Sequence, residues 1–190
     1  MRPVPLAHRV PLAHRLFLAI RPPAPVDGQI DNLGEQEALG AQRVRPDHLH
    51  ATMAITDDFP AEPKRLADAL ITVGEAISVA PFDMAVDRLA GSARSVALRP
   101  SRRIEGLHAL HAQIAQGMRR AGLALREGWR FSPHITLFYR DGAPFSRPIT
   151  GFCWHVDELV LIHSLVGRTE HRVLGRWALD GRGDRQLALF

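Results

Sequence analysis

The sequence predicts an α+β domain built from two pseudo-symmetric lobes around a central cleft. Strands and helices are predicted in the order β-α-β-α-β-β and then α-β-β-β, which is not the strict alternation of a parallel α/β fold. A phrase of the form His-x-Thr-apolar occurs once in each half, as His50-Ala51-Thr52-Met53 and His134-Ile135-Thr136-Leu137. With 190 residues, 46% of them hydrophobic, the chain is long enough for one domain with a substantial core.

The first predicted strand covers residues 16–20, a short apolar run typical of a buried strand. Residues 21–25 contain three prolines and end this strand, because proline donates no hydrogen bond to a sheet ladder. Residues 26–39 are a weak helix candidate, and residues 40–47 form a basic connector.

Residues 48–55 predict the next strand. Alternation places His48, His50 and Thr52 on one face and apolar side chains on the other. A helix follows over about residues 63–77, with proline at its first position and apolar residues at helical spacing.

Residues 82–89 and 92–98 predict a β-hairpin around Ala90-Gly91. Residues 106–125 are the longest helix candidate, because their apolar residues recur at helical spacing. Gly122 weakens the end of this helix.

Three β segments follow. Phe131-Ser132-Pro133 introduces the strand 134–139, which carries the second His-x-Thr phrase, and Asp141-Gly142 marks a turn. Residues 152–166 and 172–179 are apolar and rich in β-forming residues, with a Gly-Arg-Thr-Glu turn between them.

Composition narrows the class of protein. The single cysteine, Cys153, excludes an intramolecular disulfide framework and fits a reducing cytoplasm, which is the predicted compartment. No apolar run approaches the roughly 20 residues that span a bilayer, so no membrane association is expected. Prolines and histidines interrupt the N-terminal region, so no secretory leader is expected there.

The net charge is +4, and Lys64 is the only lysine among the 24 Lys and Arg residues. Two explanations of this arginine excess stay open, a compositional bias of the genome and an anionic partner. Arginine suits phosphate because its planar guanidinium makes bidentate hydrogen bonds.

The repeated phrase carries the candidate chemistry. Residues two apart in a strand point the same way, so each copy offers one imidazole and one hydroxyl on a single face. Two such faces supply two histidines for proton transfer near neutrality and two hydroxyls for an oxyanion. Opening a 2′,3′-cyclic phosphate needs one group to take a proton from water and another to protonate the departing ribose oxygen. The scheme needs no metal or other cofactor, and it predicts a bell-shaped pH profile that belongs to the pair.

Four phrases resemble the two-histidine (2H) phosphoesterase superfamily, and within it the bacterial RNA 2′,3′-cyclic phosphodiesterases, also called 2′–5′ RNA ligases. They are Arg15-Leu16-Phe17-Leu18-Ala19-Ile20, Leu49-His50-Ala51-Thr52-Met53, Pro133-His134-Ile135-Thr136-Leu137, and Val156-Asp157-Glu158-Leu159-Val160-Leu161 followed by Ser164. The resemblance implies a bilobal fold of two mostly antiparallel sheets flanked by helices. It also implies hydrolysis of cyclic phosphate ends to 2′-phosphates, with reversible 2′–5′ RNA ligation in some members.

By this resemblance, His50 and His134 form the catalytic acid–base pair, and Thr52 and Thr136 bind the substrate phosphate. His134 is assigned to activate water and His50 to protonate the leaving oxygen. The two motifs are near-equivalent, so the sequence itself leaves that assignment open.

Four further positions bear on the substrate. Many relatives carry an arginine five residues after the second histidine, where this chain has Tyr139. Ideal alternation places Arg140 on the face of His134, so Arg140 is either a phosphate ligand or a solvated residue at the strand end. Phe17 either stacks a base near the cleft or packs in the core. His171 stands near where relatives often carry a tyrosine, which leaves the substrate contacts open.

His48 shares a predicted face with His50, so the two could bind a metal, but no third ligand is evident. Structural or surface roles are predicted for the other histidines discussed, which are His108, His111, His155, His163 and His171. Arg102-Arg103 and Arg119-Arg120 are either solvated pairs or guides for RNA phosphates.

The predicted domain covers residues 14–180, with an N-terminal extension at 1–13 and a C-terminal tail at 181–190. A hexapeptide is repeated without change at residues 4–9 and 10–15, and the sequence leaves its role open. Because one chain supplies both motifs, we expect a monomer.

The leading interpretation is a metal-independent cyclic phosphodiesterase acting on RNA ends or small cyclic nucleotides. One alternative is a phosphoesterase acting on another cyclic or 2′–5′ linked nucleotide. The other is a non-catalytic RNA-binding module, which strong RNA binding without turnover would favour.

Overall fold

The computed structural model of the protein describes residues 12–181, so most of the predicted N-terminal extension and C-terminal tail lies outside the described residues. The strands are β1 (Ala13–Ile20), β2 (Gln42–Arg43), β3 (Ala51–Phe59), β4 (Phe82–Gly91), β5 (Ser95–Arg99), β6 (Ile135–Tyr139), β7 (Phe145–Val156), β8 (Glu158–Val166) and β9 (Glu170–Ala178). The helices are α1 (Val26–Ala38), α2 (Lys64–Glu75) and α3 (Glu105–Arg120), and a 3₁₀ turn, η1, spans Pro46–His48.

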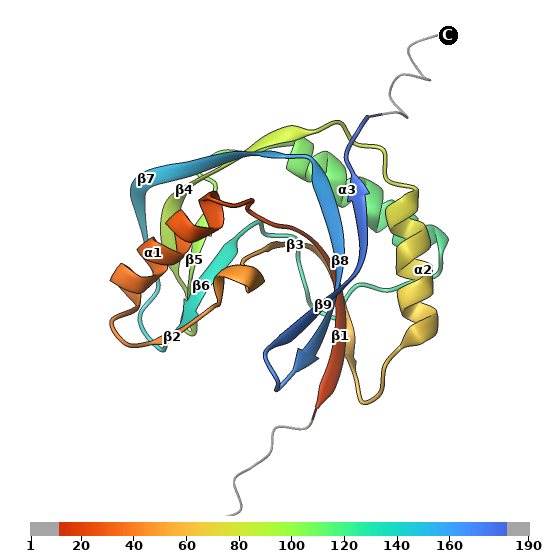
Figure 1. The fold of residues 1–190 in the computed structure, drawn as a ribbon, viewed down its shortest axis with the longest axis horizontal. Coiled ribbons are helices and arrows are strands. Elements are labelled where there is room, and N and C mark those ends of the chain that lie inside the picture. Colours follow the sequence, from red (N-terminus) through yellow and green to blue (C-terminus); the bar gives the residue numbers. More distant parts are fainter. Residues whose placement is uncertain (1–11, 182–190) are drawn as a thin grey trace, which may run out of the picture.

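Within the described residues, the strands form one nine-stranded sheet in the order β7-β4-β5-β6-β3-β1-β8-β9, with β2 added beside β6. Every pairing between these strands is antiparallel. The sheet is strongly curved, as Figure 1 shows. The predicted α+β class and antiparallel architecture are therefore confirmed.

The sheet consists of two halves of similar topology, β7-β4-β5-β6 and β3-β1-β8-β9. The unit β1-α1-β3 in one half corresponds in chain order to β5-α3-β6 in the other. The halves meet at a single ladder position between β3 and β6, where Ala51 lies opposite Ile135. The two sheets expected from the sequence are thus joined into one. They are joined by Ala51 and Ile135, the middle residues of the two His-x-Thr motifs.

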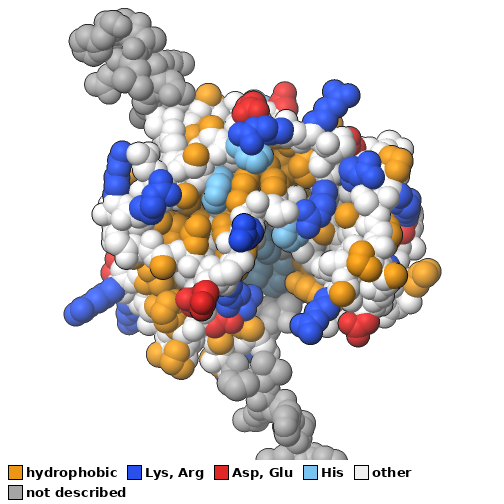
Figure 2. All heavy atoms as spheres, turned by 180° about the vertical axis from the view of Figure 1, so that it is seen from behind, with side chains coloured by type: hydrophobic (Ala, Val, Ile, Leu, Met, Phe, Trp, Pro, Cys, Tyr) orange, Lys and Arg blue, Asp and Glu red, His pale blue; other side chains and the backbone are white. Residues whose placement is uncertain are grey.

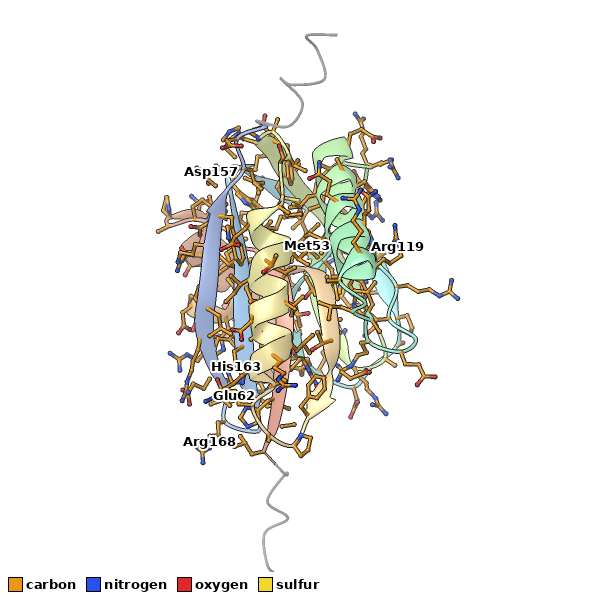
Figure 3. All side chains as sticks on the ribbon, turned by 90° about the vertical axis from the view of Figure 1, so that its right-hand side faces the viewer. Met53, Glu62, Arg119, Asp157, His163 and Arg168 are labelled. Atoms are coloured by element: carbon orange, nitrogen blue, oxygen red, sulfur yellow. The ribbon has the colours of Figure 1, made fainter. Side chains whose placement is uncertain are left out.

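Helices α2 and α3 lie side by side on one face of the sheet (Figure 3). Their apolar stripes supply much of the core, through Ala67, Leu70, Val73, Leu107, Leu110, Ile114 and Met118. Met53 of β3 lies beneath these helices and is fully buried. Helix α1 packs against β6, while α3 packs against β3, so each helix that precedes a motif covers the motif strand of the other half.

The two motif strands each contain a β-bulge at the same position of the motif. Between β1 and β3 the register passes from Leu18 opposite Ala54 to Ala19 opposite Thr52, which leaves Met53 as the extra residue. Between β5 and β6 the equivalent shift leaves Leu137 as the extra residue. Two consecutive side chains after each Thr are therefore buried, and strict alternation ends there.

Most predicted elements are confirmed, with shifts at their ends. The motif strand β3 begins at Ala51 rather than at residue 48, because a proline opens the 3₁₀ turn η1 immediately before it. Helix α3 ends at Arg120, shortly before Gly122, whose φ of 69° lies in the left-handed region. Strand β7 begins at Phe145, although no strand was predicted for its first half. Among the helices of residues 12–181, none has both the length and the apolar character to cross a bilayer.

Candidate active site

An open cavity of about 370 Å³ lies where the two halves of the sheet meet. Figure 2 shows histidine side chains gathered around a hollow on this face, with Lys and Arg side chains at its rim. Residues from both motifs and from neighbouring strands line the cavity, including Phe17, His50, Thr52, Thr136, Tyr139 and His171. Beneath it lies a small apolar cluster of Phe17, Ala19, Val160 and Ile162, separate from the main core.

The single pairing between Ala51 and Ile135 determines how the motifs meet. In an antiparallel pair, the residues that flank an opposed pair lie opposite each other in crossed order. Extending the register by one position places His50 beside Thr136 and Thr52 beside His134. Each histidine is therefore next to the hydroxyl of the other motif, an arrangement with local two-fold pseudo-symmetry.

Each motif histidine is held by a backbone carbonyl two residues before it. The Nδ1 of His50 lies 2.6 Å from the carbonyl oxygen of His48, and the Nδ1 of His134 lies 2.7 Å from that of Ser132. A carbonyl can only accept, so Nδ1–H donates in both rings. Nε2 of each ring is then the nitrogen that remains for proton transfer.

His50 lies in a cluster of aromatic rings on the cleft face. Its ring stacks on Phe17 at a centroid distance of 4.6 Å and meets the edge of His171 at 5.8 Å. His171 in turn stacks on His48 at 3.9 Å. The Nδ1 of His171 is buried and has no hydrogen-bond partner among the described residues.

This burial favours the neutral form of the clustered histidines. Burial, with the nearby charges of His134, Arg21 and His48, lowers the pKa of His50 to about 4. Burial, with the nearby charges of His48, His50 and Arg21, lowers the pKa of His171 to about 3. At neutral pH both rings are therefore uncharged in the unliganded protein.

His134 lies in a simpler environment. It is partly exposed and is not among the side chains that line the cavity volume, although its charge acts on the pKa of His50. Burial lowers the pKa of His134, and the positive charge of Arg99 lowers it further. The unliganded protein thus favours the neutral form of both motif histidines at neutral pH.

The expectation from ideal alternation was wrong for Tyr139 and Arg140. The bulge at Leu137 shifts the alternation of β6 by one residue, so Tyr139 lines the cavity and Arg140 does not. The guanidinium of Arg140 lies 5.4 Å from the centroid of the Phe145 ring instead. The structure therefore does not bring Arg140 to Thr52 and Thr136, the other residues predicted to bind phosphate.

The structure also places Phe17, His48 and His171. Phe17 is packed in the structure, with 4% of its surface exposed, and it also lines the cavity against His50, while the stacking of a base on it stays a prediction. His48 is buried against His171, and residues 12–181 contain no group of three or more His, Cys, Asp or Glu side chains placed to hold a metal ion. His171, predicted to be structural, lines the cavity. Spacing along the chain did not indicate this, because β9 and η1 meet only in the folded chain; the one signal was the resemblance, in which relatives often carry a tyrosine near this position.

A curved antiparallel sheet whose halves each bring a His-x-Thr motif to one cavity defines a two-histidine phosphoesterase. Comparison of the sequence with family models agrees. The model of the 2′-5′ RNA ligase superfamily matches residues 22–168, and the chain belongs to that family. No curated protein sequence matches the chain.

Solved structures of the same fold cover nearly the whole chain. Escherichia coli LigT complexed with 3′-AMP superposes with a TM-score of 0.71 and 27% sequence identity, over 88% of this chain and 98% of LigT. The apo form of E. coli LigT gives a TM-score of 0.70 and 30% identity, over 89% and 99% of the two chains. The protein TT0787 of Thermus thermophilus gives 0.70 and 25%, over 88% and 98%. The predicted two-histidine phosphoesterase fold is confirmed.

Proposed function

We propose that the protein hydrolyses the 2′,3′-cyclic phosphate ends of RNA or of nucleotides to 2′-phosphates, without a metal ion. The observation that carries the proposal is the crossed pairing at Ala51 and Ile135, which sets each histidine beside the hydroxyl of the other motif. A phosphate on the pseudo-two-fold axis has one imidazole on each side, which suits in-line attack and departure.

In this scheme, one neutral imidazole takes a proton from water through Nε2 as the water oxygen bonds to phosphorus. The bond between phosphorus and the 3′ oxygen breaks, and the second imidazole, protonated, gives its proton to that oxygen. The products are a 2′-phosphate and a 3′-hydroxyl. The hydroxyls of Thr52 and Thr136 donate hydrogen bonds to the non-bridging oxygens, where negative charge is held. The assignment of His134 as base and His50 as acid stays a prediction.

The substrate itself helps to charge the acid. Both histidines are neutral in the unliganded site, and an anionic phosphate between them favours the protonated form of one ring. The solved complexes of E. coli LigT with 3′-AMP and with phosphate show that a similar fold binds such anions. Because the cavity is open, it can admit the end of an RNA chain as well as a mononucleotide. Reversible 2′–5′ RNA ligation and action in the cytoplasm as a monomer belong to the same proposal.

Phosphorus NMR of a 2′,3′-cyclic nucleotide and of a short RNA with that end tests the proposal, in buffer containing EDTA. Wild type should convert the cyclic phosphate to a 2′-phosphate, while His50→Ala and His134→Ala should give no detectable conversion. His155→Ala is the matched control, because His155 is an exposed histidine bonded to Asp83 outside the cavity. It should retain wild-type conversion.

Other outcomes separate the alternatives. A 3′-phosphate product would contradict the proposed regiochemistry. Turnover only of a different cyclic or 2′–5′ linked nucleotide would replace the substrate but keep the site. Tight RNA binding with no turnover of any of these substrates would establish the binding module and overturn the enzyme.

A further inference from the structure

The register of the sheet places one arginine beside each motif histidine. On β1, Ile20 lies opposite Ala51, so the next residue, Arg21, lies beside His50. On β5, Leu98 lies opposite Ile135, so Arg99 lies beside His134. The two positions correspond under the pseudo-two-fold axis, because β1 and β5 occupy equivalent places in the two halves.

The sequence repeats with the same spacing around both arginines. Ala19-Ile20-Arg21-Pro22 ends β1, and Ala97-Leu98-Arg99-Pro100 ends β5. In each copy the apolar residue before the arginine belongs to the core, while the alanine two positions before it lies on the arginine's own face. In each copy the proline then ends the strand.

Both arginines hydrogen-bond the segment that orients their histidine. Arg21 donates to the backbone carbonyl of Asp47 in η1, and the neighbouring carbonyl of His48 accepts from the Nδ1 of His50. Arg99 donates to the hydroxyl of Ser132 at 2.8 Å, and the carbonyl of Ser132 accepts from the Nδ1 of His134. In both halves the arginine therefore bonds the short segment before the motif, whose backbone carbonyl holds the imidazole, through a backbone carbonyl in one half and a serine hydroxyl in the other.

Neither arginine has its charge neutralised by a carboxylate of the described residues. The arginines that line the cavity do have carboxylate partners, namely Asp58 for Arg15, Asp31 and Glu35 for Arg43, and Asp47 for Arg45. Arg21 and Arg99 form no ion pair with any residue of 12–181. Their positive charge is therefore available to act on the adjacent imidazole.

We propose that Arg21 and Arg99 are a pseudo-symmetric pair of positioning residues, each holding the motif histidine of its own half in orientation and placing a positive charge beside it. Only the expected effect of these arginines on turnover rests on the proposed function, while their effect on the orientation and charge of the histidines does not. Orientation follows from the hydrogen-bonded chains, and it determines which ring nitrogen serves proton transfer. The pair was missed at the sequence level, where only the histidine phrases were compared.

The charged groups around His50 differ from those around His134, so the effect of Arg21 can be measured separately from that of Arg99. The titratable and charged groups that face His50 are His48 of η1, His171 of β9, His134 just before β6 and Arg21 just after β1. For His134, Arg99 of β5 is the charged group that lowers the pKa, beyond burial. Removal of one arginine should therefore change mainly the histidine of its own half.

The test is an NMR titration of the imidazole C2–H signals, assigned with His50→Ala and His134→Ala, in Arg21→Gln and Arg99→Gln. Arg21→Gln should raise the pKa of His50 and leave that of His134 unchanged, and Arg99→Gln should do the reverse. Arg21→Lys and Arg99→Lys keep the charge and should keep the wild-type titrations. Arg140→Gln is the matched control, because Arg140 packs on Phe145 outside the cavity, and it should change neither histidine.

Turnover of a 2′,3′-cyclic nucleotide gives the second readout. Both glutamine variants should lower kcat about 10- to 100-fold with KM within about twofold, as expected for misplaced catalytic groups. A rise in KM with unchanged histidine titrations would show phosphate binding instead and would overturn positioning. Equal changes of both histidines in either variant would show a merely structural role. If wild type does not turn over the nucleotide, the proposed function fails, while the titrations still decide the role of the arginines.

Discussion

Lowering the pH from 7 to 5 should destabilise the fold through the histidines of the cavity. His50 and His171 have an ordinary pKa of 6.5, which burial lowers to about 4 and about 3 in the folded chain. Below pH 6.5 the unfolded chain binds protons that the folded chain excludes, so stability is lost as the pH falls. The loss continues until the pH reaches each folded pKa and then stops growing.

The size of the effect follows from these values. At pH 5 each histidine is almost fully protonated in the unfolded chain and largely neutral in the fold, which costs about 2 kcal/mol per ring relative to pH 7. The two rings together therefore account for on the order of 3–4 kcal/mol, a large part of a typical domain's stability. The carboxylate of Asp58 acts outside this window, because its ion pair with Arg15 holds its pKa below the ordinary 3.8.

Urea unfolding at pH 7, 6 and 5, followed by tryptophan fluorescence, measures this loss. His171→Phe removes one titrating ring while an aromatic ring can still stack on His48, so the difference between pH 7 and pH 5 should shrink by about 2 kcal/mol. Ile114→Val is the control, because it removes a buried methyl group from α3, away from the cavity histidines, and changes no titratable group. It should lower stability equally at all three values. If His171→Phe keeps the wild-type pH dependence, the assignment of the loss to this ring is refuted.

Two further predictions concern the motif hydroxyls and the helix glycines. Thr52→Val or Thr136→Val should lower kcat about 10- to 100-fold without loss of folding, because an oxyanion donor is removed, whereas the serine variants should keep most activity in the same assay. Gly106→Ala should destabilise the fold by about 1–3 kcal/mol in urea unfolding, because its Cβ would lie 2.3 Å from Cγ of Phe82. Gly28→Ala, whose Cβ meets nothing within 4 Å, should stabilise α1 by about 0.5–1 kcal/mol, and a loss there would contradict the packing argument.

Much of the fold was predictable because local patterns agreed with the final packing. The apolar stripe of α3, including Leu110 and Ile114, is buried in the structure as its helical spacing predicts. The two-residue spacing of histidine and threonine predicts that both side chains of a motif share one face of the strand. Thr52 and Thr136 indeed both line the cavity. These features depend only on residues close in sequence.

The features that were not predictable depend on residues far apart in sequence. The bulge at Leu137 is visible only against β5, and it reverses the expected positions of Tyr139 and Arg140. Likewise, His171 reaches the cavity only because β9 lies at the edge of the half that carries His50. Alternation along one strand contains no information about either contact, because both are set by pairing with other strands.

Although the two motifs are nearly identical, their histidines lie in different surroundings. The pseudo-two-fold axis gives His50 and His134 the same neighbours in kind: a threonine of the other motif, an arginine and a carbonyl at Nδ1. The rings of Phe17 and His171 break the symmetry, since both pack on His50 and neither packs on His134. When two titratable groups share a site, their different surroundings rather than their motifs separate their pKa values and so their roles. If the proposed acid and base roles hold, we expect the aromatic rings around His50, outside both motifs, to be the residues that distinguish the two histidines.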